Sequence, residues 1–257
     1  MTLVPEADLD RAAEALARAR RVSVLTGAGV SAESGVPTFR AQDGLWEQYP
    51  IEDVATADAL LRNPRLVWEF YEARRSNMQT VAPNAAHVAL AEMESLFEDF
   101  SLVTQNVDGL HRRAGSHRVL EVHGSLWRAH CMACCGRVVD PFPFPAPEIP
   151  PRCTCGGLLR PSVVLFGEML PADVLATALS DARDCDVAIS IGTSSAVWPA
   201  AGIPLAALES GAFGIEVNPE ETELTARFDV SLRGPAGRVV PELLQRVRAR
   251  RATGEVA

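Results

Sequence analysis

The sequence predicts an α/β fold in which a Rossmann-like parallel sheet, flanked by helices, carries a smaller domain. Short apolar runs recur along the chain with helical segments between them, as in buried parallel strands joined by crossover helices. A Gly-rich turn follows the first of these runs, and a cluster of cysteines interrupts the pattern near the middle of the chain. The chain has 257 residues, which is long enough for both domains.

The composition is that of a soluble globular protein, with 47% apolar and 22% charged residues. Residues 1–21 place acids before arginines and contain no apolar core, so we expect a surface helix rather than a secretion signal. The chain has no apolar run of about 18 residues, and this argues against a membrane span. The net charge of −9 argues against nucleic acid as the main ligand. We therefore predict a cytoplasmic monomer that binds no membrane.

Six apolar runs are the predicted strands of the sheet. The first spans residues 22–25, and the others lie near FSLVTQN, RVLEVHG, DVAISIGTS, FGIEVNP and FDVSLRG. Several runs end in small or polar residues, among them Asn106, Thr193 and Asn218. Because open α/β sheets bind their ligands at the carboxyl ends of the strands, we expect these residues to meet in one site.

Two segments interrupt the alternation and predict the smaller domain. Residues 44–95 are helical and contain several aromatic side chains, whereas residues 124–160 hold the cysteines and a Pro-rich loop. We predict that the first segment is a helical insert and the second a zinc-binding module. The Rossmann-like domain would then consist of residues 1–43, 96–123 and 161–257.

The motif GAGVSA directly follows the first strand and fits a dinucleotide fingerprint through Gly27, Gly29 and Ala32. Glycines in such a turn let the backbone approach a pyrophosphate, and amides at a helix start bind its charge. Two features differ from a dehydrogenase. Gly35 and Pro37 end the expected helix early, and no strand ending in an acidic residue follows about 20 residues later. On this motif alone, a dinucleotide site and an ordinary turn are both open.

Two further motifs lie at the ends of predicted strands. TQNVDGLHRRAG places Gln105, Asn106 and Asp108 just after a strand. Their amide and carboxylate groups suit ribose hydroxyls or a carboxamide, and an Asx turn that caps a helix is the alternative. EVHGS places His123 at the end of the next strand. An isolated histidine is more often structural, but the near-neutral pKa of this one makes it a candidate general base.

The cysteine cluster predicts one structural zinc ion. CMAC is followed, after eighteen residues, by CTC, so Cys131, Cys134, Cys153 and Cys155 offer four thiolates for a closed tetrahedral site. A compact cluster in a chain without a secretion signal favours metal over disulfides. Cys135 is an alternative to Cys134, and the C-x-C spacing of the second pair is less common than C-x-x-C.

Together these motifs resemble the sirtuins, a family of NAD-dependent protein lysine deacylases. GAGVSAESGVPTFR, TQNVDGLHRRAG, HGS, the four-cysteine module, VVLFGE, GTSSAV and EVN occur in the order seen in that family. The resemblance implies that NAD and an acylated lysine of another protein meet in a cleft between the two domains. NAD would be consumed. The acyl oxygen attacks the nicotinamide ribose, His123 deprotonates a ribose hydroxyl, and lysine and O-acyl-ADP-ribose are released.

The resemblance also implies roles for individual residues. Catalysis would use His123 and Asn106. The acylated peptide would contact Val164, Phe166 and Gly167, in a segment expected to pair with it as a strand. The residues implied in NAD binding are Gly27, Ala28, Gly29, Glu33, Thr38, Phe39, Arg40, Trp46, Gln105, Asn106, Asp108, Gly192, Thr193, Ser194, Asn218, Pro219, Glu220 and Ala236.

One pair of residues predicts the acyl group. Tyr71 and Arg74 are three apart in WEFYEARRSNM, so a helix presents both on one face, while Arg75 points about 100° away. The pair matches the Tyr-x-x-Arg pattern of the sirtuin class that removes succinyl and malonyl groups. A guanidinium and a phenol can both bind a distal carboxylate. We predict removal of succinyl, malonyl and acetyl groups. The alternative is an inward Tyr71 beside a solvated Arg74.

Three other activities are compatible with parts of the sequence. An NAD-dependent ADP-ribosyltransferase would use the same pocket and release nicotinamide without removing an acyl group from a peptide. A dehydrogenase would produce NADH, although the missing ribose acid argues against it. A non-enzymatic zinc-ribbon module would bind its partner without NAD.

Overall fold

Six parallel strands form the main sheet, in the order β11-β10-β9-β1-β4-β5. They belong to a computed structural model that describes residues 4–38, 45–46, 49–133 and 135–253. Each strand lies where the sequence predicts one, because each is a mostly buried apolar run. The strands are β1 (Arg21–Thr26), β4 (Asp99–Thr104), β5 (Val119–Glu121), β9 (Val187–Ile191), β10 (Phe213–Val217) and β11 (Val230–Leu232).

The order of the strands reverses beside β1. From β1 the chain builds the sheet outwards through β4 and β5, then crosses to β9 on the other side and continues through β10 and β11. The chain therefore leaves the neighbouring carboxyl ends of β1 and β9 in opposite directions. In open α/β sheets a ligand crevice forms at this switch point.

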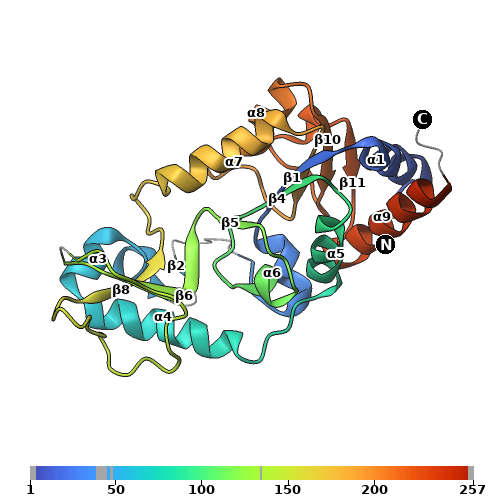
Figure 1. The fold of residues 1–257 in the computed structure, drawn as a ribbon. Coiled ribbons are helices and arrows are strands. Elements are labelled where there is room, and N and C mark those ends of the chain that lie inside the picture. Colours follow the sequence, from blue (N-terminus) through green and yellow to red (C-terminus); the bar gives the residue numbers. More distant parts are fainter. Residues whose placement is uncertain (1–3, 39–44, 47–48, 134, 254–257) are drawn as a thin grey trace.

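Helices cover both faces of the main sheet (Figure 1). One face carries α1 (Glu6–Arg18), α5 (Ala85–Glu94) and α9 (Ala236–Thr253), whose apolar side chains share one buried cluster with the strands. The other face carries α7 (Ala172–Asp184) and α8 (Gly202–Glu209), which form a second cluster rich in alanine. The sheet is thus buried on both sides, as its apolar strands require.

A smaller domain lies beside the main sheet, at the left of Figure 1. It contains a three-stranded antiparallel sheet in the order β7-β6-β8, against which the longest of its helices packs through Trp68. Its elements are α2 (Ile51–Val54), α3 (Ala57–Arg62), α4 (Pro64–Met78), β6 (Gly124–Cys131), β7 (Val138–Val139) and β8 (Leu159–Val163). The predicted fold class is confirmed.

The predicted helical insert is divided between the two parts. Its last helix, α5, packs against α9 on the main sheet, whereas α2, α3 and α4 belong to the smaller domain. The exact domain limits stay a prediction. Of the described helices, none combines the length and apolar character needed to cross a membrane. The remaining short elements are η1 (Ala28–Ser34), β2 (Leu45–Trp46), β3 (Tyr49–Pro50), α6 (Leu110–Arg113) and η2 (Thr225–Arg227).

Candidate functional site

A cleft of about 1090 Å³ opens at the carboxyl ends of the main-sheet strands and is also lined by the smaller domain. Phe39 and Arg40 lie outside the described residues, as does the side chain of Trp46. The predicted NAD, catalytic and substrate residues that line the cleft are Gly27, Ala28, Gly29, Glu33, Thr38, Tyr71, Arg74, Gln105, Asn106, Asp108, His123, Val164, Phe166, Gly167, Gly192, Thr193, Ser194, Asn218, Pro219, Glu220 and Ala236.

The Gly-rich turn after β1 packs directly against the turn after β9. The amide of Gly29 donates a 2.8 Å hydrogen bond to the carbonyl of Gly192. A Cβ atom on Gly29 would stand 2.7 Å from the Cα atom of Gly192, which is too close for any side chain. Glycine therefore lets the two turns meet backbone to backbone. The helix that follows is the short 3-10 helix η1, and it ends at Gly35 with φ 87°, as the sequence predicts.

Asn106 and Asp108 are held in place by Ser31, which the sequence analysis did not single out. The Ser31 hydroxyl donates to Asp108 Oδ2 at 2.8 Å and accepts from Asn106 Nδ2 at 3.1 Å. His87 Nε2 lies 3.3 Å from the same hydroxyl, and burial lowers the pKa of His87 to about 4. Ser31 lies inside the GAGVSA motif, but the partners that explain its role come from distant segments of the chain.

His123 lies between β5 and β6 and lines the cleft. Its Nδ1 is 2.9 Å from the carbonyl oxygen of Gln105. Because a carbonyl only accepts, Nδ1 carries the proton and Nε2 is the basic nitrogen. Burial lowers the pKa of His123, and the bond to the carbonyl partly opposes this effect. The imidazole is therefore neutral at neutral pH, which is the state that a general base needs.

Tyr71 and Arg74 lie on the face of α4 that lines the cleft. The helix begins after Asn63, whose side-chain oxygen accepts the amide of Leu66. Tyr71 is 2% exposed, and burial raises the pKa of its phenol to about 12, against the opposing charge of Arg74. The Arg74 guanidinium lies 5.7 Å from the centre of the Phe70 ring. The structure thus places both members of the pair at the cleft.

The neighbouring Arg75 does not line the cleft, as its helical position predicts, and it faces the zinc-binding module instead. It is 1% exposed and donates to the carbonyls of Phe142 and Pro143 at 2.9 and 2.7 Å. Its guanidinium also pairs with Glu72 and lies 5.0 Å from the centre of the Phe142 ring. Helix α4 therefore presents one face to the cleft and another to the module.

The segment VVLFGE has a different form from the extended strand that the sequence predicts for substrate pairing. Strand β8 ends at Val163. The amide of Val164 donates to the carbonyl of His123, and the amide of Leu165 donates to the Glu168 side chain, both at 2.9 Å. In this conformation these two amides are not available to a peptide. Pairing of the segment with a substrate stays a prediction.

Four cysteines of the smaller domain form a cluster suited to one zinc ion. The sulfur atoms of Cys131, Cys135, Cys153 and Cys155 all lie within 4.8 Å of one another, and three of the pairs are 3.4, 3.5 and 3.8 Å apart. Zinc with Zn–S bonds of about 2.3 Å has sulfur–sulfur edges of about 3.8 Å, so the cluster fits the ion. Cys134 lies outside the described residues, and Cys135, the alternative ligand, completes the described set.

Comparison with known proteins agrees with this architecture. The sequence model of the Sir2 family matches residues 27–199. An NAD-dependent protein deacylase of Aquifex aeolicus is 51% identical in sequence, and the match covers 84% of this chain and 90% of the length of that protein. One from Thermococcus kodakarensis is 48% identical over 93% of this chain and 96% of its own. A solved complex of a Sir2 homologue with NAD has a TM-score of 0.86 and 47% identity, covering 93% of this chain and 94% of that one. The chain belongs to the Sir2 family.

Proposed function

We propose that the protein is an NAD-dependent protein lysine deacylase that removes succinyl and malonyl groups as well as acetyl groups. The observation that carries this proposal is the make-up of one cleft, which is lined together by the turn at Gly29, the base His123 and the cation Arg74. The deacylases among the relatives support the type of reaction. The pair formed by Tyr71 and Arg74 supports the acidic acyl group.

The residues around His123 suit acyl transfer to NAD. When NAD is bound, the acyl oxygen attacks C1′ of the nicotinamide ribose and nicotinamide leaves. The unprotonated Nε2 of His123 then accepts the proton of a ribose hydroxyl, and that oxygen attacks the acyl carbon. Water completes the transfer and releases free lysine and O-acyl-ADP-ribose. Ser31 holds Asn106 and Asp108 in fixed orientations, so they are ready to orient the ribose and the carboxamide.

The charges at the small-domain end of the cleft favour a carboxylate. Among the described residues that line the cleft, Arg74 is the only arginine. The phenol of Tyr71, with its pKa raised to about 12, stays a hydrogen-bond donor at any working pH. Glu168 also lines the cleft, but Arg160 neutralises it through two bonds of 2.5 and 2.8 Å. A succinyl or malonyl carboxylate can therefore accept charge-assisted hydrogen bonds from the Arg74 guanidinium.

The direct test is mass spectrometry of peptides that carry acetyl-, succinyl- or malonyl-lysine, each incubated with NAD. Arg74→Met removes a charge-assisted hydrogen bond that contributes roughly 1.5–3 kcal/mol. Desuccinylation and demalonylation should slow about ten- to a hundredfold, whereas deacetylation should change much less. Tyr71→Phe should act in the same direction more weakly.

Arg65→Met is a matched control, because Arg65 lies on the same helix with its side chain 70% exposed. This variant should leave all three activities unchanged. Equal losses of succinyl and acetyl removal in Arg74→Met would contradict the proposed specificity. Release of nicotinamide while the peptide keeps its acyl group would instead indicate ADP-ribosyl transfer.

The substrate lysine has to come from another protein, since all 24 basic residues of this chain are arginines. Acylated lysine side chains of other proteins are therefore the proposed partners. A monomeric state and a cytoplasmic location stay predictions, and size-exclusion chromatography with light scattering tests the first of them.

A further inference from the structure

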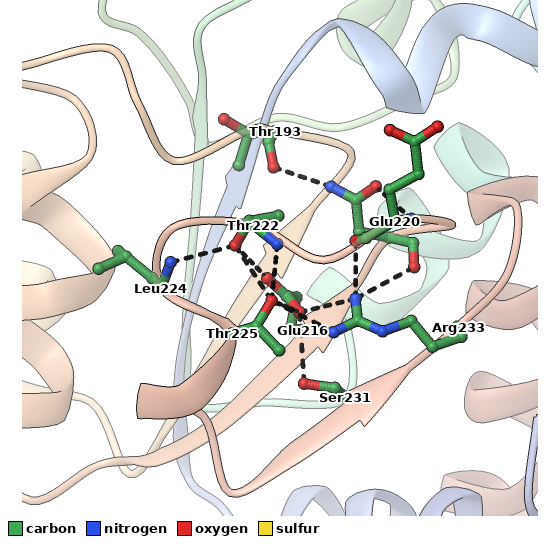
Figure 2. Close-up of polar contacts among 9 residues, drawn as sticks. Thr193, Glu216, Glu220, Thr222, Leu224, Thr225, Ser231 and Arg233 are labelled. Carbon is green, nitrogen blue, oxygen red and sulfur yellow. Dashed lines mark hydrogen bonds and ion pairs between the residues drawn. The ribbon is translucent and has the colours of Figure 1, made fainter.

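A buried carboxylate, that of Glu216, lies beside loop residues that line the cleft (Figure 2). Glu216, on β10, is 1% exposed. It accepts hydrogen bonds from Thr222 Oγ1 at 2.5 Å, Thr225 Oγ1 at 2.8 Å and Ser231 Oγ at 3.3 Å. The guanidinium of Arg233 lies 2.9 Å from the same carboxylate. The charge of Glu216 is thus paired and fully hydrogen-bonded inside the protein, as a buried charge requires.

Arg233 connects this carboxylate to the wall of the cleft. Its Nη1 also donates to the carbonyl oxygen of Glu220 at 2.8 Å and to that of Asn218 at 3.4 Å. Residues 218–222, here called the rim loop, line the cleft, whereas neither Arg233 nor Glu216 does. One guanidinium therefore holds the backbone of the rim loop from behind, and Glu216 holds the guanidinium.

The rim loop is also tied to the other strand ends. Asn218 Nδ2 donates to the carbonyl of Thr193 at 2.8 Å, and Gln105 Nε2 donates to the hydroxyl of Thr193 at 2.9 Å. These contacts run from the end of β10 through the turn after β9 to the end of β4. The three strand ends that line this part of the cleft thus form one hydrogen-bonded unit.

We propose that Glu216 and Arg233 are positioning residues that fix the rim loop in the form that binds the adenosine half of NAD. The inference rests on the proposed function, which places the nicotinamide ribose at His123, just after β5. The rim loop follows β10 on the other side of the sheet, so it is left for the adenosine half. Without the pair, the rim loop would populate forms that bind poorly, and the apparent Kd would rise by the inverse of the competent fraction. The reacting atoms lie at His123 instead, so turnover at saturating NAD should be preserved.

Arg233→Met tests this inference, because methionine keeps an unbranched stem and removes every donor. If the rim loop is then competent about one tenth of the time, the Kd for ADP-ribose and the KM for NAD should each rise about tenfold. Calorimetry measures the first and steady-state kinetics the second. The kcat and the KM for the acylated peptide should stay near their wild-type values. Arg233→Lys retains one cationic donor, so its Kd and KM should lie between those of the wild-type protein and of Arg233→Met.

Arg246→Met is the matched control for a purely structural loss. Arg246 is 23% exposed, against 24% for Arg233, and it pairs with Glu6, Asp10 and Glu242 without lining the cleft. Both variants should lower the Tm, but only Arg233→Met should weaken ADP-ribose binding. Unchanged affinity in Arg233→Met, or equal weakening in both variants, would overturn the inference.

A milder variant covers the case in which Arg233→Met does not fold. Thr225→Val removes one donor to Glu216 and an acceptor shared by Arg233 Nη2 and the Thr222 amide. It should weaken ADP-ribose binding by a smaller factor, whereas an unchanged Kd would overturn the inference. Binding of ADP-ribose requires no acyl transfer. A wild-type protein that binds ADP-ribose without removing acyl groups would contradict the proposed function and leave the role of Arg233 intact.

Discussion

The cleft has one wall formed by the ends of the main-sheet strands and another formed by the smaller domain, and the two differ in structure. The main-sheet wall contains two turns that pack backbone to backbone, at Gly29 and Gly192, and the rim loop, whose backbone Arg233 holds from behind. The small-domain wall consists largely of side chains, among them Tyr71 and Arg74. Two turns packed this closely leave no room for a side chain at Gly29, and such a fixed surface suits a co-substrate of constant structure. Side chains can differ one at a time, which suits the recognition of a variable acyl group.

The two walls also differ in what supports them. The main-sheet wall continues the strand ends of a sheet buried on both faces. The small-domain wall depends on α4, which the zinc-binding module holds through Trp68, Glu72 and Arg75. Damage to the first wall should therefore affect every acyl substrate alike, whereas damage to the second should spare the binding of the nucleotide.

The largest effect is expected from a substitution of His123, because the proposed base acts on every acyl substrate. His123→Ala removes the base, and because general base catalysis contributes about 10²–10⁴-fold, removal of every acyl group should nearly cease. Zinc content and Tm should be unchanged. His117→Ala is the control, since that side chain is 88% exposed. Rates with acetyl and succinyl peptides provide the measurement, and near wild-type turnover in His123→Ala would exclude His123 as the base.

The same role has a signature in the pH dependence of the wild-type protein. Burial holds the pKa of His123 below the ordinary histidine value of about 6.5. Lowering the pH through that pKa protonates the base, so kcat/KM should fall on the acid side with a midpoint below about 6.5. A midpoint well above that value would indicate that another group limits the reaction.

A smaller but uniform loss is expected from Gly29→Ala. The added Cβ would stand 2.7 Å from the Cα of Gly192, so the two turns would have to separate. A misplacement of about 1 Å can cost as much as a hundredfold in rate. ADP-ribose affinity should fall, and kcat/KM should fall by the same factor with acetyl and succinyl peptides. A loss confined to one acyl group would mean that this wall also selects the acyl chain.

The smallest effect on catalysis is expected from Cys153→Ser, which removes one zinc ligand. Metal binding is coupled to folding in small modules, so the zinc content should drop from one ion per chain and α4 should lose its support. The KM for the succinyl peptide should rise several-fold, while the Kd for ADP-ribose should stay unchanged. Metal analysis measures the zinc content, steady-state kinetics the KM, and calorimetry the Kd. Wild-type protein without zinc would disprove the metal site, and weaker ADP-ribose binding would show that the walls are coupled.

Most of the fold could be predicted from the sequence because its signals are local. Each main-sheet strand is a mainly apolar run, and the polar residues that follow the strands converge because parallel strands share one edge. The supports of the site could not be predicted in this way. Ser31 contacts His87 and Asp108, and Glu216 contacts Arg233, across segments that no local pattern connects.

The sequence by itself determined the places of the six main-sheet strands along the chain, the early end of the helix after the Gly-rich turn, and the common face of Tyr71 and Arg74. Spacing along the chain is enough for each of these. Only the tertiary structure decided that α4 meets the cleft on one face and the zinc-binding module on the other, and that His123 is half-buried with its Nδ1 bound to Gln105. Burial and its effect on the pKa depend on neighbours that come from distant parts of the chain, and these are brought together only by folding.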